Sequence, residues 1–453
     1  MVRDSMVRDP DVIVIGAGAA GLAAAASLGH SGLSVLTLEA RDRIGGRIFT
    51  QRDPAFDAPI ELGAEFIHGR PRELWDLFRQ SNVTVNEVDG DSWCVTDGRL
   101  APCSFFNQVD EILDEMDDRA LDESFLEFLQ HCCANPVKGF DQKAKERALA
   151  YVTGFNAANP SLVGVHWLVE EMRAEGRIDG ERAFRPQNGY EDLVEIFRRR
   201  LADAEAALRT GNVVDRIQWE RDHVEVTAHD VRGSSVFSAA RVLVTLPLEV
   251  LKTPAGQAGA IEFAPALPRH KLAALNLVEM GKVIRVVLRF RHRFWDNVSP
   301  AGHAAKTLSD MSFLFSQDEW FPTWWTSLPA RLPIITGWAP FRSAERLSGR
   351  SRSFVVDRSL KSLAEQLQIS THQLENEFQA AYFHDWQNDP FSRGAYSYGK
   401  VGADGAQRTL AAPLENSLFF AGEATDVSGH NGTVHGAIAS GYRAATEILQ
   451  GLA

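Results

Sequence analysis

The chain has 453 residues, of which 45% are hydrophobic and 24% charged, the composition of a globular protein large enough for two or three domains. Its formal net charge of -13 argues against nucleic acid as a partner, because phosphate binding needs clustered basic charge. No stretch approaches the ~20 consecutive apolar residues of a membrane span. These features predict a globular protein located in the cytoplasm.

The four cysteines, Cys94, Cys103, Cys132 and Cys133, show no metal-ligand spacing. The adjacent pair cannot easily close a relaxed disulfide. We therefore predict structural cysteines, a reducing compartment and no metal site. The first ten residues are predicted to be a frayed start of the chain.

The first predicted elements are a strand and a glycine turn in residues 11–21, DVIVIGAGAAG. Gly16, Gly18 and Gly21 fit the spacing G-x-G-x-x-G. The first glycine permits a tight turn, the second lets the backbone approach a pyrophosphate, and the third lets helix and strand pack closely. An Ala-rich helix is predicted over residues 22–28, and its N-terminus would face the phosphates with free N–H groups.

A second strand is predicted over residues 34–39 and ends at Glu39, the spacing that places a carboxylate on a ribose hydroxyl. A glycine turn between a strand and a helix, followed by this acidic residue, predicts dinucleotide binding. The next residues narrow the choice of dinucleotide.

Residues 39–47, EARDRIGGR, resemble the E-A-R-x-R-x-G-G-R segment of the flavin amine oxidase superfamily. The resemblance implies FAD rather than NAD as cofactor. It implies that Gly45 and Gly46 pass against the pyrophosphate, and that Arg41 and Arg47 supply positive charge.

The resemblance continues in order along nearly the whole chain. Residues 61–69, ELGAEFIHG, look like the segment that passes under the isoalloxazine ring. Residues 184–193, FRPQNGYEDL, look like the entry to the second stretch of the FAD domain, and Val214 would contact the adenine end through its backbone. Residues 241–251, RVLVTLPLEVL, resemble a buried strand that ends in the family's T-x-P-L turn.

Near the C-terminus, residues 418–426 (LFFAGEATD) and 432–444 (GTVHGAIASGYRA) resemble the family's last strand and helix. In the family this helix points its N-terminus at the pyrimidine edge of the flavin, and the counterpart of Glu423 binds near the ribityl-phosphate. The cofactor-binding residues implied by the resemblance are Gly16, Gly18, Ala19, Ala20, Gly21, Glu39, Ala40, Arg41, Gly45, Gly46, Arg47, Leu62, Gly63, Ala64, Glu65, Val214, Gly422, Glu423, Thr433 and Val434.

Residues 386–398, WQNDPFSRGAYSY, resemble the W-x-x-D-P-x-x-R-G-S-Y-S-Y segment of polyamine oxidases and histone lysine demethylases. The resemblance implies that Tyr396 is one wall of an aromatic cage before the flavin, and that Trp386 lies at the pocket or the flavin edge. Ala395 stands where monoamine oxidases have a flavin-bonded cysteine, so FAD is expected to be non-covalent. Thr433 stands at the second cage tyrosine, so the cage is expected to be half open.

A departure from the family occurs in residues 281–285, GKVIR. Relatives have a lysine here that holds a water against flavin N5 and aids the reaction with oxygen. Aligned through the downstream pair at residues 294–295, that position is Arg285. Lys282 lies three residues away, which on a strand is the opposite face. Arginine is bulkier, permanently protonated and fork-shaped, so rapid use of oxygen becomes uncertain while FAD binding is expected to survive.

These features predict an α/β protein with a discontinuous Rossmann-like FAD-binding domain (residues 11–72, 184–262 and 405–453), interleaved with an α+β substrate domain (73–183 and 263–404). In the substrate domain, Val109, Ile112, Leu113 and Met116 recur at helical spacing and are expected in the core. Strands are expected at residues 282–290 and 334–338. The Trp-rich stretch 320–338 fits a bulky or aromatic substrate and interior packing equally well.

The resemblance implies an oxidoreductase that oxidises an amine to an imine by hydride transfer to flavin N5, with oxygen as acceptor and hydrogen peroxide as product. No acid-base triad is needed, because the cofactor carries the chemistry and the protein orients the C–H bond. The expected partners are a small amine and oxygen. Alternatives are a related desaturase or isomerase, an amine dehydrogenase with another acceptor, or a non-catalytic FAD-bound protein with a blocked cavity.

Overall fold

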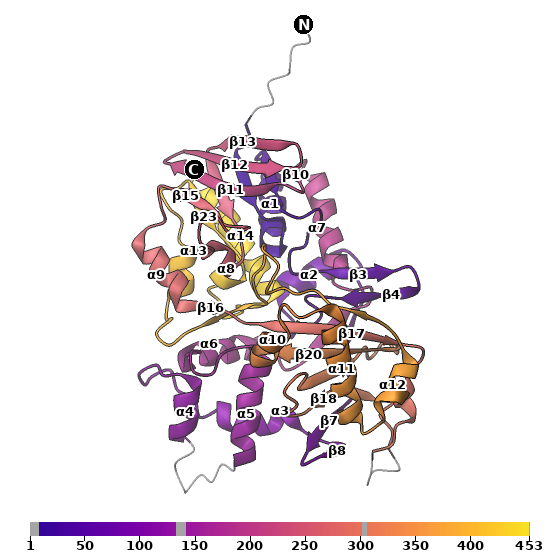
Figure 1. The fold of residues 1–453 in the computed structure, drawn as a ribbon. Helices are drawn as coiled ribbons and strands as arrows, with labels where there is room; N and C mark the ends of the chain where they lie inside the picture. The colour runs from indigo at the N-terminus through magenta and orange to yellow at the C-terminus, as the bar shows by residue number, and fades with distance from the viewer. Residues whose placement is uncertain (1–8, 133–141, 301–305, 453) are drawn as a thin grey trace.

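The computed structural model describes residues 9–132, 142–300 and 306–452 and centres on a five-stranded parallel sheet (Figure 1). Its strand order is β10-β2-β1-β14-β23, and every neighbouring pair is parallel. All but β10 are runs of buried residues, as expected for a parallel sheet covered on both faces. The bounds are β1 Val12–Ile15, β2 Val35–Leu38, β10 Ala207–Arg209, β14 Arg241–Val244 and β23 Leu418–Phe420.

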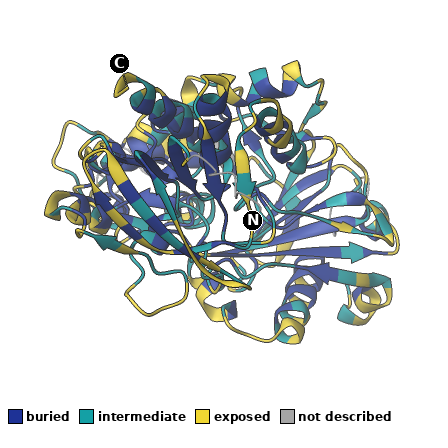
Figure 2. Cartoon of the chain, turned by 90° about the horizontal axis from the view of Figure 1, so that it is seen from above, coloured by how far each residue is buried: buried dark blue, intermediate teal, exposed yellow. Residues whose placement is uncertain are grey.

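Alternate residues of β1 face two separate cores, because successive side chains of a strand point to opposite faces. Val12 and Val14 pack with helices on one face, whereas Ile13 and Ile15 pack toward the antiparallel sheet on the other. Figure 2 draws the strands of this sheet largely in dark blue, the colour of buried residues. The helices of the first face are α1 Ala19–His30, α2 Arg72–Gln80, α7 Glu191–Asp203 and α14 Val434–Gln450.

A four-stranded sheet, in the order β13-β12-β11-β15, lies against the second face (Figure 1, top). Its bounds are β11 Val213–Glu220, β12 His223–Asp230, β13 Gly233–Ala239 and β15 Glu262–Ala264. Three helices and the 3-10 turn η2 contribute to this core, and a further 3-10 turn, η1, follows β17 in the chain. They are α8 Leu248–Leu251, α9 Arg269–Leu277 and α13 Ala406–Ala411, with η1 Phe294–Asn297 and η2 Glu423–Thr425.

The lower part of Figure 1 contains a seven-stranded sheet in the order β21-β17-β20-β19-β18-β7-β8. Its strands are β7 Asp91–Thr96, β8 Arg99–Pro102, β17 Val283–Phe290, β18 Met311–Phe315, β19 Thr323–Thr326, β20 Ile334–Pro340 and β21 Phe378–Tyr382. The helices α10 Phe341–Leu347, α11 Arg352–Leu367 and α12 Thr371–Glu377 share a hydrophobic core with it.

Beside this sheet lies a group of four helices with a core of its own: α3 Phe105–Leu113, α4 Phe125–Cys132, α5 Gln142–Gly154 and α6 Val165–Gly176. Short strands link the upper and lower parts of the molecule. They are β3 Thr50–Asp53, β4 Phe56–Glu61, β5 Ile67–His68, β6 Val85–Glu87, β9 Ala183–Pro186, β16 Val278–Met280 and β22 Ser397–Gly399.

The predicted α/β class and parallel nucleotide-type sheet are confirmed. The predicted helix at residues 22–28 is part of α1, and the strands predicted at 282–290 and 334–338 correspond to β17 and β20. Val109, Ile112, Leu113 and Met116 are all buried, as their spacing predicted. The domain boundaries stay a prediction. Within the described ranges, no helix is both long and apolar enough to cross a bilayer.

The cysteine prediction is wrong for one pair, because Cys94 and Cys103 form a disulfide with their Cα atoms 5.7 Å apart. Pairing of β7 with β8 brings Cys94 opposite Ala101, two residues from Cys103, and this hairpin register sets the short distance. Disulfides are rare in reducing compartments, so the cysteines do not support the predicted reducing compartment. Of the ten residues predicted as a frayed start, residues 1–8 lie outside the described residues, and so does Cys133 of the adjacent pair.

Candidate functional site

One cavity of about 1050 Å³ extends from the edge of the parallel sheet to the helical group of the lower part. All residues that the sequence assigned to cofactor or substrate line it, with the exception of Gly21. That glycine packs instead against the turn, since a Cβ there would lie 1.9 Å from the Gly16 carbonyl oxygen. The sequence motifs, although dispersed along the chain, therefore meet around one space.

The β1–α1 turn forms one wall of the cavity. Gly16 has φ 101°, a left-handed conformation that favours glycine. A Cβ on Gly18 would meet open space, with only the Gly46 Cα as near as 4.0 Å. Gly18 also caps α1 without any side-chain hydrogen bond. The turn is thus a bare backbone surface at a helix N-terminus, the donor chemistry that suits a pyrophosphate.

Glu39 follows β2 and is buried. Its Oε2 accepts the Ala17 N–H at 2.8 Å and its Oε1 accepts the Arg41 N–H at 2.9 Å. The carboxylate is therefore fixed by backbone donors at the end of the glycine turn. Val214, the predicted adenine contact, lines the same end of the cavity.

The two arginines expected to supply positive charge are already paired with acids. Arg41 donates to Asp389 at 2.7 Å, and Arg47 donates to Glu423 at 3.0 Å and to the Ala395 carbonyl oxygen at 2.7 Å. Their charges are therefore balanced within the protein. These pairs lock the EARDRIGGR loop onto the C-terminal segments that form the other side of the cavity.

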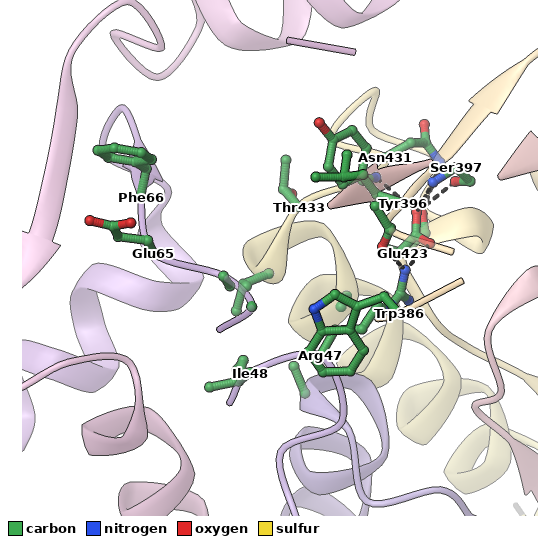
Figure 3. A pocket seen from close by; sticks show the side chains of 18 of the residues that line it. Arg47, Ile48, Glu65, Phe66, Trp386, Tyr396, Ser397, Glu423, Asn431 and Thr433 are labelled. Atoms are coloured by element: carbon green, nitrogen blue, oxygen red, sulfur yellow. Dashed lines mark hydrogen bonds and ion pairs between the residues drawn. The ribbon is translucent and has the colours of Figure 1, made fainter. Parts of the chain in front are cut away.

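Glu423 is buried where several chain segments meet (Figure 3). Its Oε2 accepts from the Ser397 hydroxyl at 2.6 Å and from the Gly432 N–H at 2.9 Å, while Oε1 binds Arg47. The carboxylate is therefore a structural link between the cage segment and the start of α14. A cofactor contact of its side chain stays a prediction.

Helix α14 begins at the cavity wall. Thr433 is its N-cap: the hydroxyl accepts the Gly436 N–H at 2.9 Å and donates to the His430 carbonyl oxygen at 2.7 Å. Val434 follows at the first helical position and also lines the cavity. The positive end of the helix dipole thus lies at the cavity. Residues 62–65 form another part of the wall of the same cavity.

Trp386 and Tyr396 lie on the cavity wall from one chain segment, as Figure 3 shows. Trp386 is buried and its indole N–H donates to the Leu62 carbonyl oxygen at 2.8 Å. The Tyr396 hydroxyl donates to the Phe155 carbonyl oxygen at 2.6 Å. Both rings are thus fixed by backbone acceptors in front of the α14 terminus.

Further aromatic side chains enclose the chamber beside Tyr396. Trp325 and Trp338 line it with their ring centroids 5.6 Å apart, whereas Trp324 is fully buried in the hydrophobic core. The Trp-rich stretch therefore contributes rings both to the cavity wall and to the packed core, and a bulky or aromatic substrate stays a prediction. Burial lowers the pKa of His68 to about 4 and that of His435 to about 3, so neither is a cation at neutral pH.

Arg285 is buried on β17 with its guanidinium at the cavity. It donates to the Gly63 carbonyl oxygen at 2.7 Å and forms an ion pair with Glu65. Lys282, as expected, does not replace it, because that side chain is exposed and pairs with Glu345 at 2.8 Å. The fork of Arg285 is therefore occupied by two fixed acceptors.

Several residues of the site were missed from the sequence. Arg185 Nε lies 2.8 Å from Glu65 Oε1, and the Trp325 indole donates to Glu65 Oε2 at 2.9 Å. On α6, Glu171 and Glu175 line the cavity, and neither was singled out from the sequence. The signal that could have found them is two acids four residues apart, which share one face of a helix.

A nucleotide-type sheet, a bare glycine turn and an aromatic chamber thus meet around one cavity, and known proteins share this fold. The model of the flavin containing amine oxidoreductase family matches residues 19–449. The chain therefore belongs to that family and is a flavin-dependent amine oxidoreductase.

Two plant proteins illustrate its relatives. The chain is 29% identical over 467 residues to polyamine oxidase 4 of Oryza sativa subsp. japonica, covering 97% of this chain and 88% of that protein. It is 30% identical over 463 residues to lysine-specific histone demethylase 1 homolog 2 of Arabidopsis thaliana, covering 97% of this chain and 58% of that protein. Wild-type putrescine oxidase bound to putrescine has the same fold, with a TM-score of 0.79 at 21% identity, covering 97% of this chain and 99% of that chain.

Proposed function

We propose that the protein oxidises a primary or secondary amine to an imine with FAD as cofactor and oxygen as electron acceptor, so that hydrogen peroxide is the second product. The single observation that supports this most strongly is the continuity of the cavity, from the Glu39 carboxylate and the bare turn at Gly18 to the chamber at Tyr396. A dinucleotide in one end of this space would extend toward a substrate in the other.

The residues expected to hold FAD are the glycine turn, Glu39 and the start of α14. The bare backbone at Gly18 suits the pyrophosphate, and Glu39 suits a ribose hydroxyl. We propose that binding is non-covalent. Ala395 precedes the cage tyrosine, and none of the described residues that line the cavity is a cysteine.

FAD would accept a hydride from the carbon beside the amine nitrogen. The protein's task is then to orient that C–H bond and to keep water away. Tyr396, held by Phe155, offers an aromatic face to a substrate amine. Trp325 and Trp338 make the surrounding wall apolar. Thr433 leaves the opposite wall of the cage open, as the sequence predicts.

A second candidate concerns the electron acceptor. The guanidinium of Arg285 is held by Glu65 and the Gly63 carbonyl oxygen, so it has less freedom to position a water than the lysine of relatives. This observation favours an amine dehydrogenase, in which electrons pass to an acceptor other than oxygen. A desaturase or isomerase has no comparable support from the site.

The test is to load the purified protein with FAD and to follow flavin absorbance with a panel of amines, first without oxygen and then with it. Bleaching followed by stoichiometric peroxide supports an amine oxidase. Bleaching without rapid reoxidation supports the dehydrogenase. Failure of every amine to bleach the flavin would refute amine oxidation, and failure to bind FAD would refute the cofactor assignment.

A further inference from the structure

The guanidinium of Arg41 lies between two carboxylates. Its Nη2 donates to Asp389 Oδ1 at 2.7 Å, whereas its Nη1 lies 3.8 Å from Glu39 Oε1. Side-chain exposure is 12% for Arg41, 8% for Asp389 and 5% for Glu39, so all of these charges are enclosed. Enclosed charges interact more strongly than charges in water. The two distances show that Arg41 is bound to Asp389 and that Glu39 is a second acid within its reach.

The turn at residues 389–392 offers this guanidinium further contacts. The Ser392 hydroxyl accepts from the same Nη2 at 3.2 Å, and the Phe391 ring centroid lies 5.5 Å from the Arg41 Cζ. Hydrogen bonds of its own close the turn. Asp389 Oδ1 accepts the Phe391 N–H at 2.8 Å, and the Asp389 carbonyl oxygen accepts the Ser392 N–H at 3.1 Å. The receptor for Arg41 is therefore one fixed turn of the chain.

The Asp389 carboxylate keeps its charge. Burial by itself raises the pKa of this carboxyl, but hydrogen bonds from His384 and Arg41 outweigh burial and hold the pKa well below its ordinary value. The His384 Nε2 lies 2.7 Å from Oδ2, so it occupies the oxygen that Arg41 does not use. Because Asp389 stays ionised around neutral pH, it attracts Arg41 throughout that range.

Glu39 has acceptor capacity left for a ligand. Of the roughly four lone-pair positions of a carboxylate, the backbone N–H groups of Ala17 and Arg41 use two. An acidic residue at the end of this strand suits a ribose hydroxyl of a dinucleotide. The Arg41 guanidinium is a planar fork of N–H donors that matches a carboxylate, so it would occupy the remaining positions if it turned toward Glu39. One carboxylate therefore has two competing ligands.

The neighbouring Arg43 does not compete for Glu39. Its Nη1 donates to the Ile48 carbonyl oxygen at 3.2 Å, and its Cζ lies 4.0 Å from the centroid of the Phe49 ring. These contacts direct its guanidinium to another part of the loop. The loss of Asp389 would therefore release Arg41 toward Glu39 and leave Arg43 in place.

We propose that Asp389 is a positioning residue for the cofactor: it binds the Arg41 guanidinium, so that the Glu39 carboxylate stays free for the ribose hydroxyls of FAD. Asp389 is not one of the described residues that line the cavity, so it acts through Arg41 and not by contact with the cofactor. The inference goes beyond the proposed reaction and rests on one part of it, FAD as the cofactor.

The test is a fluorescence titration of the apoprotein with FAD. Asp389→Asn should raise the Kd by about tenfold or more, because the released Arg41 occupies Glu39. Arg41→Gln removes the competitor, so Asp389→Asn/Arg41→Gln should bind FAD within about threefold of Arg41→Gln alone, and more tightly than Asp389→Asn. The control is Asp42→Asn, which removes the same unit of charge from an exposed side chain beside Arg41 and should change the Kd by less than about twofold.

A double variant that binds FAD as weakly as Asp389→Asn would overturn the proposal, because Arg41 would then not cause the loss. An unchanged Kd in Asp389→Asn would overturn it as well. Melting temperatures show whether each variant folds. If Asp389→Asn does not fold, Ser392→Ala weakens the same contact of Arg41. That change should raise the Kd by about threefold alone and leave it unchanged in the Arg41→Gln background, and equal losses in both backgrounds would overturn the proposal.

A crystal structure of the Asp389→Asn apoprotein provides a readout without FAD. The Arg41 guanidinium should then lie within about 3.2 Å of the Glu39 carboxylate, and a guanidinium that remains at residue 389 would contradict the proposal. The titration uses no amine, so it gives the same answer whether or not the enzyme oxidises one. Wild-type protein that does not bind FAD would refute the cofactor assignment, and the position of Arg41 in the crystal would still decide between its two acids.

Discussion

Replacing Glu65 by glutamine tests the ion-pair cluster beside the cavity. The Glu65 carboxylate binds Arg285, lies 2.8 Å from Arg185 Nε and accepts the Trp325 indole N–H at 2.9 Å. Side-chain exposure is 11% for Glu65, 11% for Arg185 and 4% for Arg285. The substitution therefore leaves two enclosed guanidinium ions near one another, with a single amide oxygen for three donors.

Removing one partner of a buried ion pair destabilises a protein by about 3–5 kcal/mol. We therefore expect Glu65→Gln to lower the melting temperature at pH 7, in excess FAD, by about 3–5 °C. The matched control is Glu319→Gln, whose pair with Arg346 has 62% and 44% exposed side chains. That change should alter stability by less than about 1 kcal/mol. A Glu65→Gln melting temperature indistinguishable from that of the control would refute the reasoning.

The same variant has a defined pH dependence. Burial by itself raises the pKa of Glu65, but Arg185 and Arg285 outweigh burial and lower the pKa below its ordinary value of 4.5. A lowered folded-state pKa gives stability that is fully present above the unfolded pKa and is lost as pH falls through the folded pKa. The stability difference between wild type and Glu65→Gln should therefore be constant near neutrality and shrink below about pH 4.5, as measured by urea unfolding.

Three further outcomes are expected. Gly18→Val fills the open cradle of the β1–α1 turn and should reduce FAD affinity by about 100-fold or more in fluorescence titration, with unchanged circular dichroism. Arg285→Lys should speed reoxidation of the flavin by oxygen about tenfold in stopped-flow measurements, which corresponds to a barrier lower by ~1.4 kcal/mol. An unchanged rate would show that Arg285 does not limit the reaction with oxygen. Tyr396→Phe keeps the ring but loses the hydrogen bond to Phe155, so kcat/KM should fall about 3- to 10-fold, less than in Tyr396→Ala.

The nucleotide end of the site was predictable because its determinants are local in sequence. A strand, a turn and a helix follow one another within residues 11–30, and Gly16 has the left-handed φ of 101° that this turn requires. Glu39 ends the adjacent strand and reaches the Ala17 N–H because β1 and β2 pair in parallel register. The long motif at residues 386–398 likewise predicted which residues line the cavity together.

The partners of the charged side chains could not be predicted, because they come from distant parts of the chain. Glu65 and Arg285 are 220 residues apart, and Arg47 and Glu423 are 376 apart. The resemblance implied that Arg41 and Arg47 supply positive charge, and only the fold shows that Asp389 and Glu423 are their partners. Only the tertiary structure determines which opposite charge lies within reach of a buried ion.

By itself the sequence determined the family, the nucleotide-type turn and the residues of the cage motif, since these are contiguous patterns with a local physical cause. The tertiary structure decided that Glu171 and Glu175 face a chamber and that Arg285 is held by Glu65. The reason is that periodicity reports which side of a helix or strand points inward. Whether that interior is packed core or an open cavity depends on elements that the sequence places far away.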